Sequence, residues 1–143
     1  MKLTKDFSFD ASHRLPRYKG PCNRLHGHRW TLTVEVEGLV DPESGMVIDY
    51  REIARITRPI IDQLDHRHLG TWEGIDIIHR DAWKPYTVPL DFYPTSENLL
   101  YLIADQIGAT LPWSQLSLRE TPSSGAMLSQ EDYRRTRDAV SCR

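Results

Sequence analysis

The stretch from His26 to Glu37 reads HGHRWTLTVEVE and alternates apolar or aromatic side chains with polar ones. Because successive side chains of a β-strand point to opposite faces, this alternation predicts a strand with one buried face. His26, His28 and Trp30 lie on that face, ahead of three aliphatic residues. Gly27, between the histidines, adds no side chain to the opposite face and so permits another backbone to approach closely.

Residues 2–13 predict a second strand, because their apolar residues share one parity and end in His13. The loop over residues 15–25 contains two prolines and a glycine, which allows the two strands to lie antiparallel. His13 then comes to the same face as the two histidines of the first strand. The loop also brings Cys22 near the three imidazoles.

Three neutral imidazoles with an open fourth position are typical of a catalytic zinc site, whereas structural zinc sites usually have four protein ligands. We therefore predict that His13, His26 and His28 hold zinc for catalysis. Core histidines satisfied by hydrogen bonds are the alternative interpretation, and the convergence of three beside a cysteine argues against it. Cys22 as a fourth ligand would close the site and make a non-catalytic zinc module, an alternative that the spacing leaves open.

Two helices are predicted from apolar residues that recur at helical spacing. The first follows a capping-box pattern at residues 49–52 and extends to residue 64. Pro59 lies inside it and is expected to kink or break it, at a cost of roughly 3 kcal/mol. The second helix begins at residues 94–97 and ends at Gly108.

Alternation over residues 116–121 and 126–128 adds two short strands, and residues 129–140 predict a terminal helix with a serine cap. The order of the main elements predicts an α+β fold, a four-stranded antiparallel sheet with two helices packed on one face. We expect one domain over residues 1–143. Residues 70–93 are rich in aromatic side chains and lack sustained periodicity, which we interpret as an extended insertion.

The composition excludes several classes of function. Lys and Arg number 18 against 20 Asp and Glu, and no segment gathers basic residues, so direct binding of nucleic acid is not expected. No apolar stretch is long enough for a membrane span or a signal peptide, which predicts a soluble, cytoplasmic protein. The two cysteines form no disulfide framework.

Six motifs occur in order along most of the chain: FSFDASH at 7–13, CNRLHGH at 22–28, GMVIDY at 45–50, LDH at 64–66, PTSEN at 94–98 and LRET at 118–121. Together they resemble the zinc-dependent 6-pyruvoyltetrahydropterin synthase and 6-carboxytetrahydropterin synthase family, which has the tunnelling fold. The resemblance implies zinc on the three histidines, Cys22 as the catalytic proton acceptor, and Asp65 with His66 as a proton relay. It also implies that Glu120 anchors the pterin, since a carboxylate accepts two parallel hydrogen bonds.

Thr95, Ser96 and Glu97 match positions at which that family lines its pterin pocket. A helix cap explains Thr95 and Ser96 equally well. Their role in substrate binding is therefore implied by the resemblance alone.

The resemblance further implies 7,8-dihydroneopterin triphosphate as the substrate. Three residues separate Cys22 from His26, a spacing that favours the branch forming 6-carboxy-5,6,7,8-tetrahydropterin. That branch releases acetaldehyde and triphosphate and belongs to 7-deazaguanine (queuosine precursor) biosynthesis. Formation of 6-pyruvoyltetrahydropterin from the same substrate is the alternative, and a pterin-binding scaffold without turnover is an alternative of another class.

A short four-stranded sheet leaves its edges and one face exposed, and four tryptophans are difficult to bury in so small a unit. We therefore expect a homo-oligomer. The family that the chain resembles closes such sheets into barrels across subunits, commonly as hexamers, with active sites shared between chains.

Overall fold

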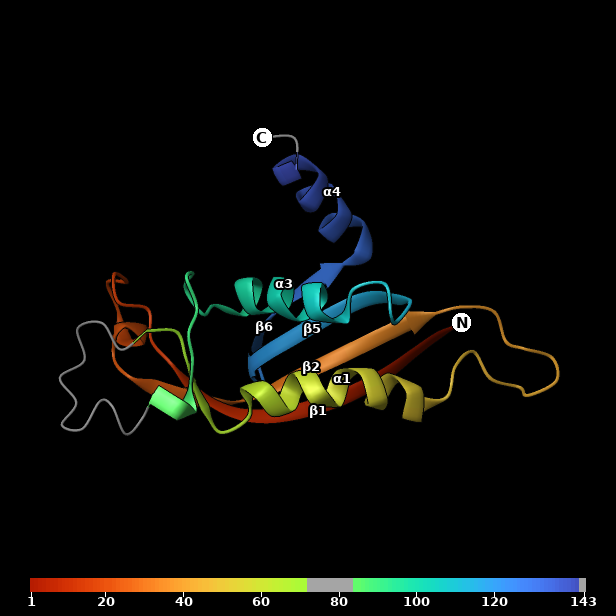
Figure 1. The fold of residues 1–143 in the computed structure, drawn as a ribbon, viewed down its shortest axis with the longest axis horizontal. Coiled ribbons are helices and arrows are strands. Elements are labelled where there is room, and N and C mark those ends of the chain that lie inside the picture. Colours follow the sequence, from red (N-terminus) through yellow and green to blue (C-terminus); the bar gives the residue numbers. More distant parts are fainter. Residues whose placement is uncertain (72–83, 142–143) are drawn as a thin grey trace.

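The computed structural model of the protein describes residues 1–71 and 84–141, and Figure 1 shows how the elements of these segments are arranged. Within them, six strands form one curled sheet in the order β4-β3-β1-β2-β5-β6. The strands are β1 (Lys2–His13), β2 (His26–Glu37), β3 (Arg67–Leu69), β4 (Thr87–Val88), β5 (Trp113–Thr121) and β6 (Ser124–Ser129). The described helices are α1 (Tyr50–Leu64), α3 (Ser96–Ile107) and α4 (Gln130–Ser141), with short 3-10 turns η1 (Pro21–Asn23) and η2 (Lys84–Tyr86).

The prediction of four strands is wrong, because β3 and β4 add a parallel edge to the antiparallel sheet. β3 pairs with the end of β1 that carries His13, and β4 pairs with β3. Both strands are too short for a period of two to be recognised in the sequence. β4 also shows that part of the predicted insertion at 70–93 joins the sheet, while residues 72–83 lie outside the described residues.

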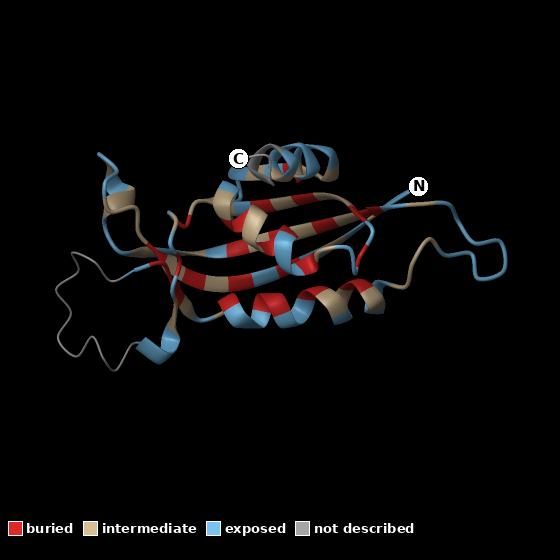
Figure 2. Ribbon diagram, turned by 45° about the horizontal axis from the view of Figure 1, so that its top comes forward, coloured by how far each residue is buried: buried red, intermediate tan, exposed pale blue. Residues whose placement is uncertain are grey.

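The two long strands are confirmed with the predicted faces. They pair antiparallel over their whole length, so that Phe9 faces Trp30 and His13 faces His26. The aromatic and aliphatic residues of this face are buried, and helices α1 and α3 cover them. Figure 2 shows α1 with its buried side against the sheet and its exposed side outward. The other face of β1 and β2 carries polar side chains, and none of the three described helices covers it.

The helices follow their sequence signals with one exception. Asp49 caps α1 through a hydrogen bond from the Arg51 N–H, and Thr95 caps α3 through one from the Asn98 N–H. Of the kink or break predicted at Pro59, the break is wrong, since α1 extends through this residue to Leu64. Pro59 lies on the exposed side of the helix, where water can bond the backbone carbonyl that loses its partner.

The C-terminal helix is confirmed, and it extends from the end of β6 (Figure 1). Ser129 accepts a hydrogen bond from the Asp132 N–H at 3.1 Å, as the predicted cap requires. Trp30 and Trp113 are both buried, whereas Trp72 and Trp83 lie outside the described residues. Among the described helices none is long and apolar enough to cross a membrane.

Candidate metal centre

Three histidines converge at the end of the helix-covered face of β1 and β2. His13 pairs with His26 in the ladder, and His28 pairs with Ala11 on the same face. The ring centroids are 4.5 Å apart for His13 and His26, 5.2 Å for His13 and His28, and 5.0 Å for His26 and His28. The structure therefore brings the three predicted metal ligands together.

Backbone carbonyls fix which nitrogen two of these imidazoles present. His13 donates from Nδ1 to the Pro94 carbonyl at 2.8 Å, and His26 donates from Nδ1 to the Arg24 carbonyl at 2.7 Å. A carbonyl can only accept, so each neutral ring keeps a lone pair on Nε2. Such a hydrogen bond from the second nitrogen is the usual way to orient a metal-ligating histidine.

The nitrogens that face the middle of the cluster lack protein partners. Nε2 of His13 and Nε2 of His28 are buried and have no hydrogen bond to any described residue. Leaving a buried polar atom unsatisfied costs about 1–3 kcal/mol, so two adjacent ones are unusual in a hydrogen-bonded core. Because a metal ion would satisfy both lone pairs at once, the donor set fits a metal.

Glu120 adds a carboxylate to the cluster. Its Oε1 lies 3.1 Å from Nε2 of His13 and 3.5 Å from Nε2 of His28, and 29% of its side chain is exposed. One ligand atom from each of the four residues lies within 4.8 Å of the others. Three imidazoles and a carboxylate are a ligand set for divalent metals such as zinc.

The electrostatics favour neutral imidazoles. Burial lowers the pKa of His13 to about 4, against the smaller opposing effect of its bond to Pro94. Burial also lowers the pKa of His28, and Glu120 opposes that shift. Since metals bind the neutral ring, His13 needs to lose no proton at neutral pH before it can act as a ligand.

Two further features shape the cluster. The indole of Trp30 meets His13 and His28 edge-on, with centroids 5.1 Å and 5.6 Å away, and forms an apolar wall beside them. A Cβ at Gly27 would lie 3.0 Å from the Ala11 carbonyl oxygen, so the strands approach closely here, as the sequence predicted. Both features limit where the rings can move.

Cys22 lies on η1 in the loop between β1 and β2, and its side chain is half-buried. A hydrogen bond from the Leu15 N–H to the Cys22 carbonyl, 2.8 Å long, holds this part of the loop together. The thiol is not part of the four-residue ligand group. Among the described residues Glu120, rather than Cys22, lies where a fourth ligand would be.

Asp65 and His66 follow α1 and form a second group away from the histidine cluster. The Asp65 carboxylate accepts the Asp10 N–H at 2.8 Å and lies 3.0 Å from Nδ1 of His66. These two contacts, the backbone one first, lower the pKa of Asp65. His66 has φ 56°, a left-handed conformation that among the described residues no other non-glycine adopts, and its side chain is 78% exposed.

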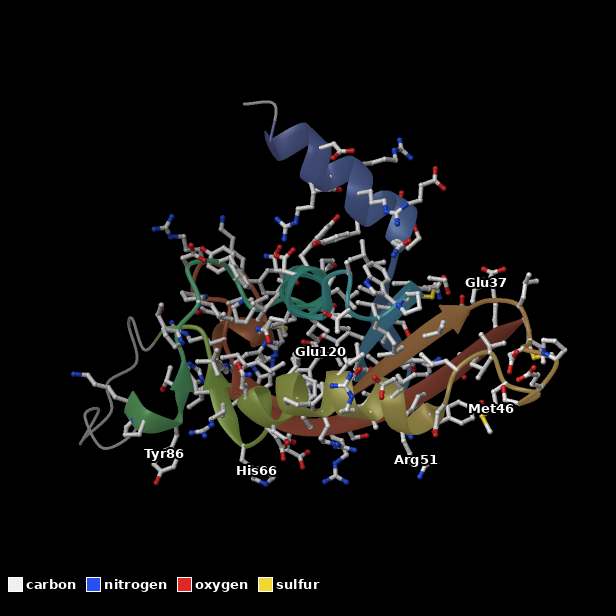
Figure 3. All side chains as sticks on the ribbon, turned by 45° about the vertical axis from the view of Figure 1, so that its right-hand side comes forward. Glu37, Met46, Arg51, His66, Tyr86 and Glu120 are labelled. Carbon is white, nitrogen blue, oxygen red and sulfur yellow. The ribbon has the colours of Figure 1, made fainter. Side chains whose placement is uncertain are left out.

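The Asp65–His66 pair lies toward the polar face of the sheet. Its neighbour there is the carboxylate of Asp10, whose position in β1 has the opposite parity to His13. Figure 3 shows His66 well apart from Glu120 and pointing outward. The structure therefore does not bring the predicted relay to the metal cluster of the same chain.

The predicted pocket residues at the start of α3 make local contacts. The Thr95 hydroxyl accepts the Asn98 N–H at 3.3 Å, and Ser96 donates to the Glu97 carboxylate at 3.5 Å. Glu97 itself is exposed. The residue of this motif that does reach the cluster is Pro94, through its carbonyl, and no side-chain pattern in the sequence could have indicated it.

His68 is a second residue that sequence reasoning missed. It is buried on β3, and its Nδ1 lies 3.0 Å from the hydroxyl of Ser12. Burial lowers the pKa of His68. Its position two residues after His66 was the available signal, but the short strand β3, on which His68 lies, was not predicted.

The fold and the cluster together define a class: an enzyme with a candidate histidine–carboxylate metal centre on a curled α+β sheet. The chain matches the family model described as 6-pyruvoyl tetrahydropterin synthase over residues 2–131, and it belongs to that family.

Similar proteins agree with this assignment. The 6-carboxy-5,6,7,8-tetrahydropterin synthase of Haemophilus influenzae is 30% identical over 135 residues, which cover 86% of this chain and 94% of that protein. The 6-pyruvoyl tetrahydrobiopterin synthase of Poecilia reticulata is 31% identical over 135 residues, which cover 83% of each. The solved 6-pyruvoyl tetrahydropterin synthase of Caenorhabditis elegans shares the fold, with a TM-score of 0.69, 23% identity, and 90% and 94% of the two chains covered.

Proposed function

We propose that residues 1–143 form a zinc-dependent lyase domain that converts 7,8-dihydroneopterin triphosphate and water to 6-carboxy-5,6,7,8-tetrahydropterin, acetaldehyde and triphosphate. The product would serve 7-deazaguanine (queuosine precursor) synthesis. The observation that carries the proposal is the convergence of three imidazoles, two of them with buried and unpartnered Nε2 atoms. Zinc bound there supplies a Lewis acid that polarises the oxygens of the substrate side chain.

The carboxy branch is supported by two features. Three residues separate Cys22 from His26, and relatives of similar length and about 30% identity carry the name 6-carboxy-5,6,7,8-tetrahydropterin synthase. Formation of 6-pyruvoyltetrahydropterin remains the second candidate, because the Poecilia reticulata relative named for that activity is equally similar.

Each site residue has a separate role in metal binding, proton transfer or pterin binding. His13, His26 and His28 hold the metal, and the carbonyls of Pro94 and Arg24 keep two of their rings in the correct tautomer. Cys22, on the loop between the two ligand strands, takes a proton from a side-chain carbon of the substrate. Glu120 accepts hydrogen bonds from the amino group and the ring N–H of the pterin.

Asp65 and His66 act on the site of a neighbouring copy. Two observations support this proposal: the group lies toward the polar face, away from its own metal cluster, and its imidazole is exposed. The left-handed backbone conformation of His66 costs of order 1 kcal/mol or more. Strained conformations of this kind occur most often at functional sites, where they fix the direction of a side chain. In a homo-oligomer, with a hexamer favoured, the pair lies near the partner's Cys22. The sheets of neighbouring subunits then form a closed barrel, with their polar faces inside.

Incubation of purified, zinc-loaded protein with 7,8-dihydroneopterin triphosphate tests the proposal. Mass spectrometry should identify 6-carboxy-5,6,7,8-tetrahydropterin, and acetaldehyde should form in equal amount. 6-Pyruvoyltetrahydropterin without acetaldehyde would decide for the second candidate. An unchanged substrate would refute both, and tight pterin binding in that case would indicate a scaffold without turnover.

A further inference from the structure

Glu120 and His13 face each other without a hydrogen bond. Oε1 of Glu120 lies 3.1 Å from Nε2 of His13, which the Pro94 carbonyl leaves with a lone pair. Two acceptor atoms this close repel each other when no proton or cation lies between them. The same oxygen lies 3.5 Å from the unpartnered Nε2 of His28. The carboxylate is therefore placed as a metal ligand, in addition to its role toward the pterin.

The backbone at Glu120 supports this placement independently. The pairing of β5 with β6 shifts by one residue between Arg119 and Thr121, so Glu120 is the extra residue of a β-bulge. Gly125 on β6 faces this bulge, and a Cβ there would lie 2.6 Å from the Leu118 carbonyl oxygen. Bulges re-aim side chains and occur next to active sites. Glu120 also shares the parity of the buried Leu116 and Leu118, so its carboxylate lies on the helix-covered face beside the three imidazoles.

One carboxylate cannot serve both partners fully at once. Parallel hydrogen bonds to the amino group and ring N–H of a pterin use both oxygens, whereas Oε1 is already directed at the imidazole nitrogens. Resting on the proposed function, we propose that Glu120 is the fourth ligand of the metal before substrate binds, and that the pterin ring withdraws it from the ion. The exchange opens a coordination position only when a pterin is in place.

A closed resting site has two physical consequences. The negative carboxylate partly neutralises a divalent ion that three neutral imidazoles leave fully charged, so metal affinity rises. Pterin and metal then compete for Glu120, so the free energies of binding the two are coupled unfavourably, and the coupling is reciprocal. This coupling distinguishes an exchangeable ligand from a permanent one.

Zinc affinity without substrate tests the ligand role. Competition with a chromophoric chelator should show that E120Q binds zinc at least about 10-fold more weakly than the wild type. Glu37→Gln, the same change at the exposed end of β2, is the matched control and should bind zinc as the wild type does. Equal affinity of E120Q and the wild type would overturn the ligand role. Circular dichroism of E120Q separates loss of a ligand from loss of the fold.

The exchange is tested on the wild type alone with 7,8-dihydropterin, which has the pterin ring without the side chain. The compound should weaken zinc binding in the chelator assay and change the visible spectrum of the cobalt-substituted protein. An unchanged spectrum, or tighter metal binding, would overturn the exchange. Neither readout requires turnover, so absence of product from dihydroneopterin triphosphate would refute the proposed function while leaving these results to stand by themselves.

Discussion

Ser12 and Gly27 face each other across the β1–β2 ladder, directly between the two pairs of residues that carry the histidines. A Cβ at position 27 would lie 3.0 Å from the Ala11 carbonyl oxygen and 3.3 Å from Cα of Ser12. The absence of a side chain at Gly27 therefore allows the strand spacing on which the metal cluster depends.

Gly27→Val should destabilise the protein by about 1–3 kcal/mol, because the added side chain pushes the strands apart. It should also weaken zinc binding, since His26 and His28 flank the position. Thr31→Val, on the same face of β2, is the control and should change neither property. Urea unfolding and chelator competition measure both, and wild-type values for Gly27→Val would refute the role of this contact.

Cys22→Ser should keep the metal and lose the reaction. The thiol lies outside the group of ligand atoms, so metal content and the spectrum of the cobalt-substituted protein should match the wild type. Turnover should fall by about 100-fold or more, as expected when a proton acceptor is removed. Loss of zinc in this variant would instead mean that Cys22 is a ligand and the site is closed.

Mixed oligomers test whether Asp65 and His66 serve a neighbouring copy. Cys22→Ala and His66→Ala should each be inactive alone. Co-expressed in one oligomer, they should recover activity at the interfaces where an intact Cys22 meets an intact His66. Mixing the two purified proteins without subunit exchange is the control. Confirmed mixed oligomers without activity would show that the relay belongs to the same chain, and full activity of His66→Ala alone would show that it plays no part.

The pKa of His13 predicts a pH dependence of stability for the metal-free protein. Burial lowers that pKa from 6.5 to about 4, so below pH 6.5 the unfolded chain binds a proton that the folded chain does not. The free energy of unfolding should fall as pH decreases from 6.5 to about 4, by about 3 kcal/mol in total for this residue.

His13→Gln supplies the comparison for this prediction. Titratable groups away from the cluster contribute equally in both proteins, so the difference in pH slope reports His13 together with its effect on the neighbouring histidines and Glu120. Urea unfolding at a series of pH values measures it. Parallel slopes for the variant and the wild type would show that His13 is as easily protonated in the folded protein as in the unfolded one.

The sequence predicts the long strands and the convergence of the histidines because their period of two is sustained over many residues. The same reasoning fails for β3 and β4, whose few residues show no period and whose pairing depends on long-range contacts. The sequence predicts the cap of α1 at Asp49. It does not predict that α1 continues through Pro59, because this depends on which side of the helix faces water.

In the site, too, features set by local sequence are predicted, whereas features set by long-range contacts are not. Parity places His13, His26 and His28 together, since side-chain direction in a strand follows from position alone. Glu120 shares the parity of the buried Leu116 and Leu118, but its approach to the imidazoles depends on how β5 pairs with β2, a long-range contact that alternation does not reveal. The distance of His66 from the cluster depends on how the end of α1 meets β1, a tertiary contact with no local signal.

The most direct test of the account compares acetaldehyde formation from 7,8-dihydroneopterin triphosphate by three samples: metal-stripped wild type, the same sample reloaded with zinc, and His26→Ala treated identically. We expect product only from the reloaded wild type, because the three imidazoles together hold the ion. Full turnover by the stripped protein, or by His26→Ala without bound zinc, would contradict a reaction centred on this metal site.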